Sequence, residues 1–170
     1  MLTQLGVSFT VIVPEVEELT AGPPPEVVAE NAYRKASSVA ADHAEALVLG
    51  VDTIVALGAR IYGKPADVDD ARATLQALAA RRHLVLSGVC LIENGQARTA
   101  VASTVVEFRA FDAGLLGWYL ASDEWRERAG GYAIQGRGAA LVARIEGDYL
   151  NVVGLPVPTL LELAPGLLIG

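Results

Sequence analysis

The hydrophobic and polar positions of this chain form two kinds of pattern, one typical of strands and one typical of helices. Short runs that are nearly continuously apolar, or that alternate with polar residues, predict strands at residues 5–13, 47–58, 84–92 and 98–111. Segments whose apolar residues recur every three or four positions predict helices at residues 26–42, 68–80, 113–122 and 159–164. The two kinds of element are interspersed, which predicts a mixed α/β fold in a single domain.

Residues that begin or end elements support this division. Asn94-Gly95 separates two of the predicted strands and favours a two-residue hairpin turn, which makes those strands antiparallel neighbours. Asp67 and Asp112 stand directly before helical segments, where a carboxylate can cap free N–H groups. The run 23–25 of three prolines is expected to exclude a helix, so residues 14–25 are predicted to be a loop. The predicted inner face of helix 68–80 consists of Val68, Ala71, Leu75 and Leu78.

Asp52 is the one charged residue in the apolar run 47–58. Moving an ionised carboxylate into such a strand is costly unless the carboxylate has a partner. Alternate residues of a strand share a face, so Asp52 lies with Gly50 and Ile54, and Gly50 is expected to leave room for a ligand. The pattern fits two roles for Asp52, a functional carboxylate or one half of a structural ion pair.

Two lysines are candidates for a site that binds phosphate. Lys35 falls on the apolar stripe of helix 26–42, with Val28, Ala32 and Val39, where it either serves a site or extends along the surface to water. Lys64 precedes Pro65, which restricts it to extended geometry and can aim its ammonium, although a solvated lysine in a turn has the same pattern.

Acidic and glycine-rich loops supply the remaining candidates. Glu15, Glu17 and Glu18 follow the first predicted strand, and a loop carboxylate together with Asp52 would suit Mg²⁺, which also takes substrate phosphates as ligands. A solvated acidic loop explains the same pattern. Gln135 lies among glycines in AGGYAIQGRG and can read the edge of a base, because its amide both donates and accepts hydrogen bonds.

Composition and charge narrow the functional classes. No apolar run reaches the roughly 20 residues of a membrane span, and no secretory signal is present, so no membrane partner is expected. The single cysteine, Cys90, cannot form an internal disulfide and is typical of a cytoplasmic protein. The net charge of −7 argues against a nucleic-acid partner, whereas a phosphorylated small molecule can bind through a divalent cation.

Several segments follow one another in a specific order: VPEVEE, VAENAYRKA, GVDTIVALGARIYGKP, TVVEFR, AGGYAIQGRGA and GDYLNVVGLP. Together they resemble the Maf family, the septum-formation-inhibitor-like nucleoside triphosphate pyrophosphatases. The resemblance implies an elongated α/β fold like that of inosine triphosphate pyrophosphatases, with a mixed sheet flanked by helices. It also implies a homodimer that hydrolyses a nucleoside triphosphate substrate to the monophosphate and pyrophosphate.

The resemblance assigns roles to the candidate residues. Asp52 is implied as the proton acceptor, Glu18 shares with it a divalent cation, Mg²⁺ or Mn²⁺, and Lys64 completes the catalytic set. Lys35 is implied to neutralise phosphate charge. Thr53 and Gln135 resemble the branch of the family that acts on dTTP and UTP. The alternatives are the branch that acts on 7-methyl-GTP and a non-catalytic nucleotide-binding regulator of septum formation.

The beginning of the chain departs from the family pattern. Family members begin with a strand and a Ser-x-Ser-Pro-Arg-Arg segment, and Met1 stands beyond the point where that segment belongs. The sequence therefore predicts a single Maf-like domain over residues 1–170 that lacks this strand and these phosphate-binding groups. We expect such a chain to be a weakened enzyme.

Overall fold

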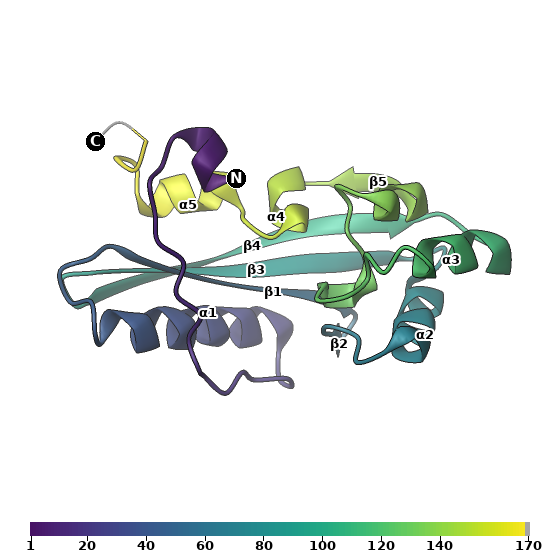
Figure 1. Cartoon of the computed structure of the whole chain (residues 1–170), viewed down its shortest axis with the longest axis horizontal. Coiled ribbons are helices and arrows are strands. Elements are labelled where there is room, and N and C mark those ends of the chain that lie inside the picture. The colour runs from purple at the N-terminus through teal and green to yellow at the C-terminus, as the bar shows by residue number, and fades with distance from the viewer. Residues whose placement is uncertain (169–170) are drawn as a thin grey trace.

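A five-stranded antiparallel sheet forms the long axis of the molecule (Figure 1). The computed structural model describes residues 1–168, so the last two residues of the predicted domain lie outside it. The strand order is β2-β1-β3-β4-β5, and the strands are β1 (Val48–Leu57), β2 (Arg60–Tyr62), β3 (Arg82–Glu93), β4 (Gln96–Phe108) and β5 (Val142–Glu146). The predicted α/β class and the elongated sheet flanked by helices are confirmed. The described strand pairs are all antiparallel, whereas the resemblance implied a mixed sheet.

Helices cover both faces of the sheet and one of its ends (Figure 1). The long helix α1 (Pro24–Ala40) packs on one face, whereas α4 (Tyr149–Val153) and α5 (Val157–Leu163) pack on the other. The helices α2 (Val68–Leu78) and α3 (Ala113–Leu120) lie together at one end. Three 3₁₀ segments complete the described helices: Leu2–Leu5, Ala129–Gly131 and Arg137–Leu141. Within residues 1–168, no helix is long and apolar enough to cross a membrane.

The predicted hairpin and helix caps are confirmed. Asn94 and Gly95 both have positive φ, 50° and 75°, as the type I′ turn between β3 and β4 requires. The Asp67 side chain accepts hydrogen bonds from the backbone N–H groups of Asp69 and Asp70. The Asp112 side chain accepts one from Leu115 and begins α3.

Two local predictions about helices were wrong. The prolines at 23–25 do not exclude a helix, because α1 begins at Pro24 with Pro23 as its N-cap. The first helical residues have no intrahelical acceptor for their N–H groups, so proline loses nothing there. In α2, Val68 is 41% exposed instead of inward-facing, and Thr74 takes the buried position, because Val68 begins the helix beyond the packed surface.

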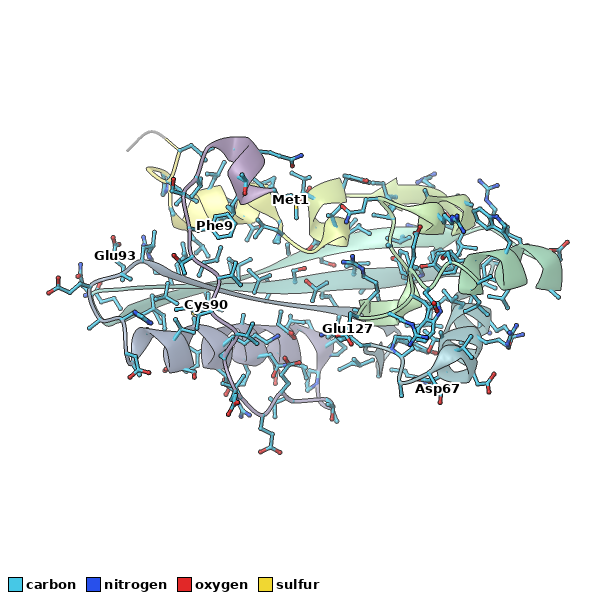
Figure 2. The ribbon with its side chains drawn as sticks, viewed as in Figure 1. Met1, Phe9, Asp67, Cys90, Glu93 and Glu127 are labelled. Carbon is cyan, nitrogen blue, oxygen red and sulfur yellow. The ribbon has the colours of Figure 1, made fainter. Side chains whose placement is uncertain are left out.

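The predicted strand at residues 5–13 is also absent. The chain forms a 3₁₀ turn at Leu2–Leu5 and then runs without helix or strand through residues 7–20. Phe9, Val11 and Val13 are each more than half exposed, and Figure 2 places Phe9 on this segment, which crosses in front of the sheet. An apolar run becomes a strand only by pairing, and no described strand pairs with it.

Gly50 and Gly88 allow α1 to approach the sheet closely. A Cβ atom at Gly50 would overlap the carbonyl oxygen of Ala32, and one at Gly88 would overlap that of Val28. The prediction that Gly50 leaves room for a ligand was therefore wrong, because the backbone of α1 fills that space. Ala32 and Val28 are fully buried as a result, and these contacts fix the distance between α1 and the strands β1 and β3.

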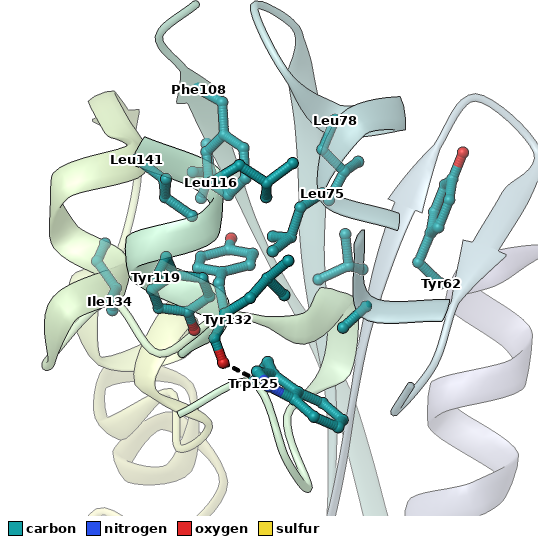
Figure 3. Packing of buried hydrophobic residues seen from close by; sticks show 14 of the residues in the cluster. Tyr62, Leu75, Leu78, Phe108, Leu116, Tyr119, Trp125, Tyr132, Ile134 and Leu141 are labelled. Atoms are coloured by element: carbon teal, nitrogen blue, oxygen red, sulfur yellow. Dashed lines mark hydrogen bonds between the residues drawn. The ribbon is translucent and has the colours of Figure 1, made fainter. Parts of the chain in front are cut away.

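The largest hydrophobic cluster lies at the end of the sheet covered by α2 and α3 (Figure 3). Aromatic residues from three separate segments meet there, and the Trp125 indole donates a hydrogen bond of 3.2 Å to the Leu120 carbonyl. This packing fixes the loop that follows α3. The most deeply buried large side chains in the cluster are Trp125, Tyr119, Phe108, Leu75, Leu78 and Leu141.

We predict that Gly88→Ala destabilises the protein by roughly 1–3 kcal/mol or more, because the new methyl group must push α1 away from the sheet. Gly117→Ala is the matched control. A Cβ at Gly117 meets nothing within 4 Å, so this exchange within α3 should be neutral or stabilising. Urea unfolding of the two variants measures the difference. Equal stability of both would contradict the close contact between α1 and β3.

Candidate functional site

A cleft of about 210 Å³ lies beside β1 and contains every residue predicted for the site except Glu18. Its floor is an apolar patch with one hydroxyl, formed by Val51, Thr53, Val55 and Val85. Its walls are formed by residues from the segment 127–135, which follows α3, and by residues 152–154 at the end of α4. Lys35, Asp52 and Lys64 complete the lining.

The cleft reaches both faces of the sheet because one edge of β1 is open. β3 pairs with β1 from Val48 to Ala56, but on the other edge β2 covers only Val55–Leu57. Asp52 and Thr53 are neighbours and therefore point to opposite faces. Since no described strand covers the edge beside them, both side chains still line one cleft.

Lys35 joins two carboxylates at one side of the cleft. Its ammonium lies 2.6 Å from Asp52 Oδ1 and 2.8 Å from Glu18 Oε1. Asp52 is buried, with 7% exposure, on the same face as Gly50 and Ile54, as predicted. Lys35 lies on the apolar stripe of α1, also as predicted, and it is paired within the site instead of extending to water.

The two carboxylates keep Lys35 charged. Burial lowers the pKa of Lys35, but hydrogen bonds and charges from Asp52 and Glu18 outweigh burial and raise that pKa above its ordinary value of 10.5. The amine is therefore an ammonium throughout the physiological range. A fixed positive charge beside a buried carboxylate is suited to binding phosphate oxygens and to orienting that carboxylate.

Asn31 is a site residue that the sequence reasoning missed. Its amide donates to Asp52 Oδ2 at 3.1 Å and to the Leu19 carbonyl at 3.0 Å, and its oxygen accepts from the Leu19 N–H at 2.7 Å. Asn31 thereby ties the loop that carries Glu18 to the strand that carries Asp52. The available signal was its spacing, because Asn31 lies one helical turn before Lys35 on the same side of α1.

Lys64 lies at the mouth of the cleft and forms an exposed ion pair of 3.0 Å with Glu127. Figure 2 places Glu127 on the segment that packs over β1 near α2. Exposed pairs contribute little stability, so Lys64 can exchange Glu127 for an anionic ligand at small cost. Arg128, which also lines the cleft, adds a second cation that the sequence reasoning missed.

Thr53 and Gln135 line the same cleft from the floor and from a wall. The Thr53 hydroxyl lies 2.8 Å from that of Ser87 on β3. Gln135 belongs to the segment 127–135, whose Gly130 N–H donates to the Gly63 carbonyl at 3.0 Å. The predicted phosphate-binding and base-reading residues are thus within one cleft, while Glu15 and Glu17 are exposed on the loop outside it.

Comparison with known proteins identifies the family. The Maf-like protein family matches residues 1–166. This chain belongs to that family. A dTTP/UTP pyrophosphatase of Symbiobacterium thermophilum is 45% identical over 159 residues, covering 92% of this chain and 82% of the relative. One of Dictyoglomus thermophilum is 41% identical over 168 residues, covering 96% and 87%, and one of Pyrococcus furiosus is 41% identical over 140 residues, covering 82% and 74%.

The donor groups of this Maf-like protein suit a hard divalent cation that also binds phosphate. Glu18 and Asp52 converge on one positive charge, the Lys35 ammonium, so their oxygens already face a common cation. Within the described residues, no group of three or more His, Cys, Asp or Glu side chains could hold a metal. Two carboxylates suffice for Mg²⁺ when waters and substrate phosphates supply the other ligands.

A buried histidine anchors the wall of the cleft in this Maf-like protein. His83 Nε2 lies 3.0 Å from the hydroxyl of Tyr132, which lines the cleft three residues before Gln135. His83 is 2% exposed, and burial lowers its pKa to about 4. A hydrogen bond with the Arg81 backbone raises this pKa, but its effect is smaller than that of burial. Burial also raises the pKa of Tyr132. Both groups are therefore neutral at physiological pH.

We predict that His83 makes the fold sensitive to acid. Its pKa is about 4 in the folded chain and about 6.5 in the unfolded chain. Between pH 4 and pH 6.5, the unfolded chain therefore binds a proton on His83 that the folded chain does not bind. The free energy of unfolding should therefore fall by roughly 3 kcal/mol as pH decreases from 6.5 to 4. In His83→Gln, which does not titrate, this contribution should be absent.

Urea unfolding at a series of pH values measures the effect. The control is His43→Gln, at an exposed histidine, which should keep the acid sensitivity of the wild type. If the stability curves of wild type and His83→Gln run parallel between pH 6.5 and 4, His83 is not the group responsible.

Proposed function

We propose that this Maf-like protein hydrolyses dTTP and UTP to the nucleoside monophosphate and pyrophosphate. The observation that carries the proposal is the buried Asp52 carboxylate, held by Lys35 and Asn31 in a cleft that two further cations line. Relatives that are 40–45% identical over most of the chain and carry the name dTTP/UTP pyrophosphatase support the same reaction.

The cations in the cleft account for binding of the triphosphate. The chain has a net charge of −7, so a polyanion needs a local excess of positive charge to enter. Among the residues that line the cavity, the three cations Lys35, Lys64 and Arg128 outnumber the two carboxylates of Asp52 and Glu127. Charge that develops on the leaving pyrophosphate is stabilised by the same groups, which are already in place before the reaction begins.

Asp52 is the proposed general base. A water molecule attacks the α-phosphorus, its oxygen forms the new P–O bond, and the bond to the β-phosphate oxygen breaks. Asp52 accepts the proton that the water loses, and pyrophosphate leaves with the bonding electrons. Lys35 on Oδ1 and Asn31 on Oδ2 fix the plane of the carboxylate, which positions it for this transfer.

Glu18 and Asp52 are the residues that would hold Mg²⁺ or Mn²⁺. A bound divalent cation supplies neutralisation of phosphate charge and polarisation of a phosphoryl oxygen. Lys35 lies between the two carboxylates and offsets one of their two negative charges, so a divalent cation would compensate the remainder.

The pyrimidine preference is assigned to Gln135 and Thr53. Thymine and uracil present carbonyl acceptors and one imide donor, and the Gln135 amide can meet both kinds of group. We also infer, from the resemblance to the family, that the enzyme is a cytoplasmic homodimer; the lone buried Cys90 suits a reducing compartment.

We predict that Asp52→Asn removes most pyrophosphate release from dTTP while the protein remains folded. The amide is nearly isosteric but cannot accept the proton from water. Asp112→Asn is the matched control, because asparagine still caps α3 and the site is unchanged. Excess chelator should abolish the activity of the wild type. Near-normal turnover by Asp52→Asn would make Asp52 a structural residue.

We predict that Gln135→Glu lowers kcat/KM for dTTP and UTP by roughly tenfold or more, because the carboxylate keeps the shape of the amide but loses its donors. Gln76→Glu, at an exposed position of α2, controls for the added negative charge. Competition between dTTP, UTP and 7-methyl-GTP measures the preference. If the unmodified chain prefers 7-methyl-GTP, the assignment to pyrimidine nucleotides is wrong.

A further inference from the structure

Ser87 lies directly behind the one hydroxyl on the floor of the cleft. Thr53 on β1 and Ser87 on β3 are paired residues of the antiparallel register, and their side chains share a face. Ser87 is completely buried, whereas Thr53 is partly exposed and lines the cleft. Their hydroxyl oxygens are 2.8 Å apart, the usual distance of an O–H···O hydrogen bond.

The direction of this hydrogen bond follows from counting donors and acceptors. Each hydroxyl has one hydrogen to donate. Among the described residues, the Ser87 hydroxyl has one hydrogen-bond partner, the Thr53 hydroxyl. Ser87 is fully buried and has no access to water. If Thr53 donated, the hydrogen of Ser87 would be buried without an acceptor, which costs about 1–3 kcal/mol. The bond therefore runs from Ser87 to Thr53.

With its oxygen engaged by Ser87, the Thr53 hydroxyl has its own hydrogen left for the cleft. We propose that Ser87 is a positioning residue that sets Thr53 as a hydrogen-bond donor and thereby selects pyrimidines that present a carbonyl over those that present an amino group. Thymine and uracil carry a carbonyl at C4, which accepts this bond. Cytosine carries an amino group there, and Thr53 could accept from it only by turning its own hydrogen away from the base, toward the apolar floor, where that hydrogen would lack an acceptor.

The cleft supports contact of Thr53 with the base. The side chains around Thr53 on the floor are apolar, Val51, Val55 and Val85, and they suit the face of a pyrimidine better than a phosphate. The cations lie elsewhere in the lining. Gln135 lines the same cleft, so a base bound there can contact both the Thr53 hydroxyl and the Gln135 amide.

This inference rests on the proposed pyrimidine nucleotide substrate, and its test separates the two. The first measurement is kcat/KM for UTP and CTP, by pyrophosphate release, in wild type and Ser87→Ala. Without Ser87, no buried hydrogen bond holds the Thr53 side chain, which can then rotate to present its oxygen to an amino group. The UTP:CTP ratio of kcat/KM should therefore fall about tenfold, with most of the change in CTP. Ser103→Ala, the same exchange at an exposed position of β4, should keep the wild-type ratio.

A double-mutant cycle tests whether Ser87 acts through Thr53. Thr53→Val removes the hydroxyl that Ser87 is proposed to orient, so adding Ser87→Ala to it should not change the UTP:CTP ratio further. Ser87→Thr keeps a buried hydroxyl donor, so this variant should keep the UTP:CTP ratio of the wild type. A purely structural role of Ser87 predicts instead an equal loss for both nucleotides and a change that persists in the Thr53→Val background.

The second measurement is binding of uridine and cytidine monophosphates by calorimetry, which does not require turnover. The wild type could release no pyrophosphate and still bind UMP more tightly than CMP, with Ser87→Ala reducing this preference. In that case the proposed function fails and the role of Ser87 stands. If UTP is hydrolysed and the ratio is unchanged in Ser87→Ala, the proposed function stands and the role of Ser87 is overturned. Equal binding of UMP and CMP by the wild type overturns it as well.

Discussion

The ion pair between Lys35 and Asp52 is the interaction on which the arrangement of the site depends. Each partner would be costly where it lies, since Asp52 is buried in an apolar strand and Lys35 interrupts the apolar face of α1. Together they fix the rotation of α1 about its axis and its register along β1. Gly50 and Gly88 make the pair possible, because only without side chains there can α1 come close enough.

The site is assembled from both faces of one strand. Lys35 and Asp52, which we propose to act at the phosphates, meet on the α1 side of β1, and the Thr53 hydroxyl, which we propose to contact the base, lies on the other side, one residue later. In this proposal, adjacent residues serve opposite ends of a nucleotide. It explains why a carboxylate and a hydroxyl stand next to each other in an otherwise apolar run, where one polar residue would already weaken the strand.

The sequence predicted the parts of the fold and site that depend on local patterns. Asp67, Asp112 and Asn94-Gly95 act through neighbours in the chain, so their roles could be predicted from a few residues. Asp52 was found because its charge contradicts the apolar run around it. The strand at residues 5–13 was wrongly predicted because pairing depends on a distant partner.

The residues that the sequence reasoning missed have roles set by distant parts of the chain. In the sequence, Asn31 is an ordinary helix residue; its role depends on Leu19 and Asp52, which contact it only in the folded chain. Ser87 reads as a small polar residue of a strand until the register places it opposite Thr53. Gly50 was noticed but misread, because the sequence shows that a side chain is absent and does not show which neighbour fills the space.

The two-residue turn between β3 and β4 has a consequence for how the molecule assembles. It joins the longest strand pair in the described chain, so this hairpin closes with little loss of chain entropy and its contacts are local. The cleft, in contrast, unites Lys35 with Gln135 and Gly154 across most of the sequence. Such distant contacts form late and open early, so local unfolding can dismantle the cleft while the central hairpin is still intact.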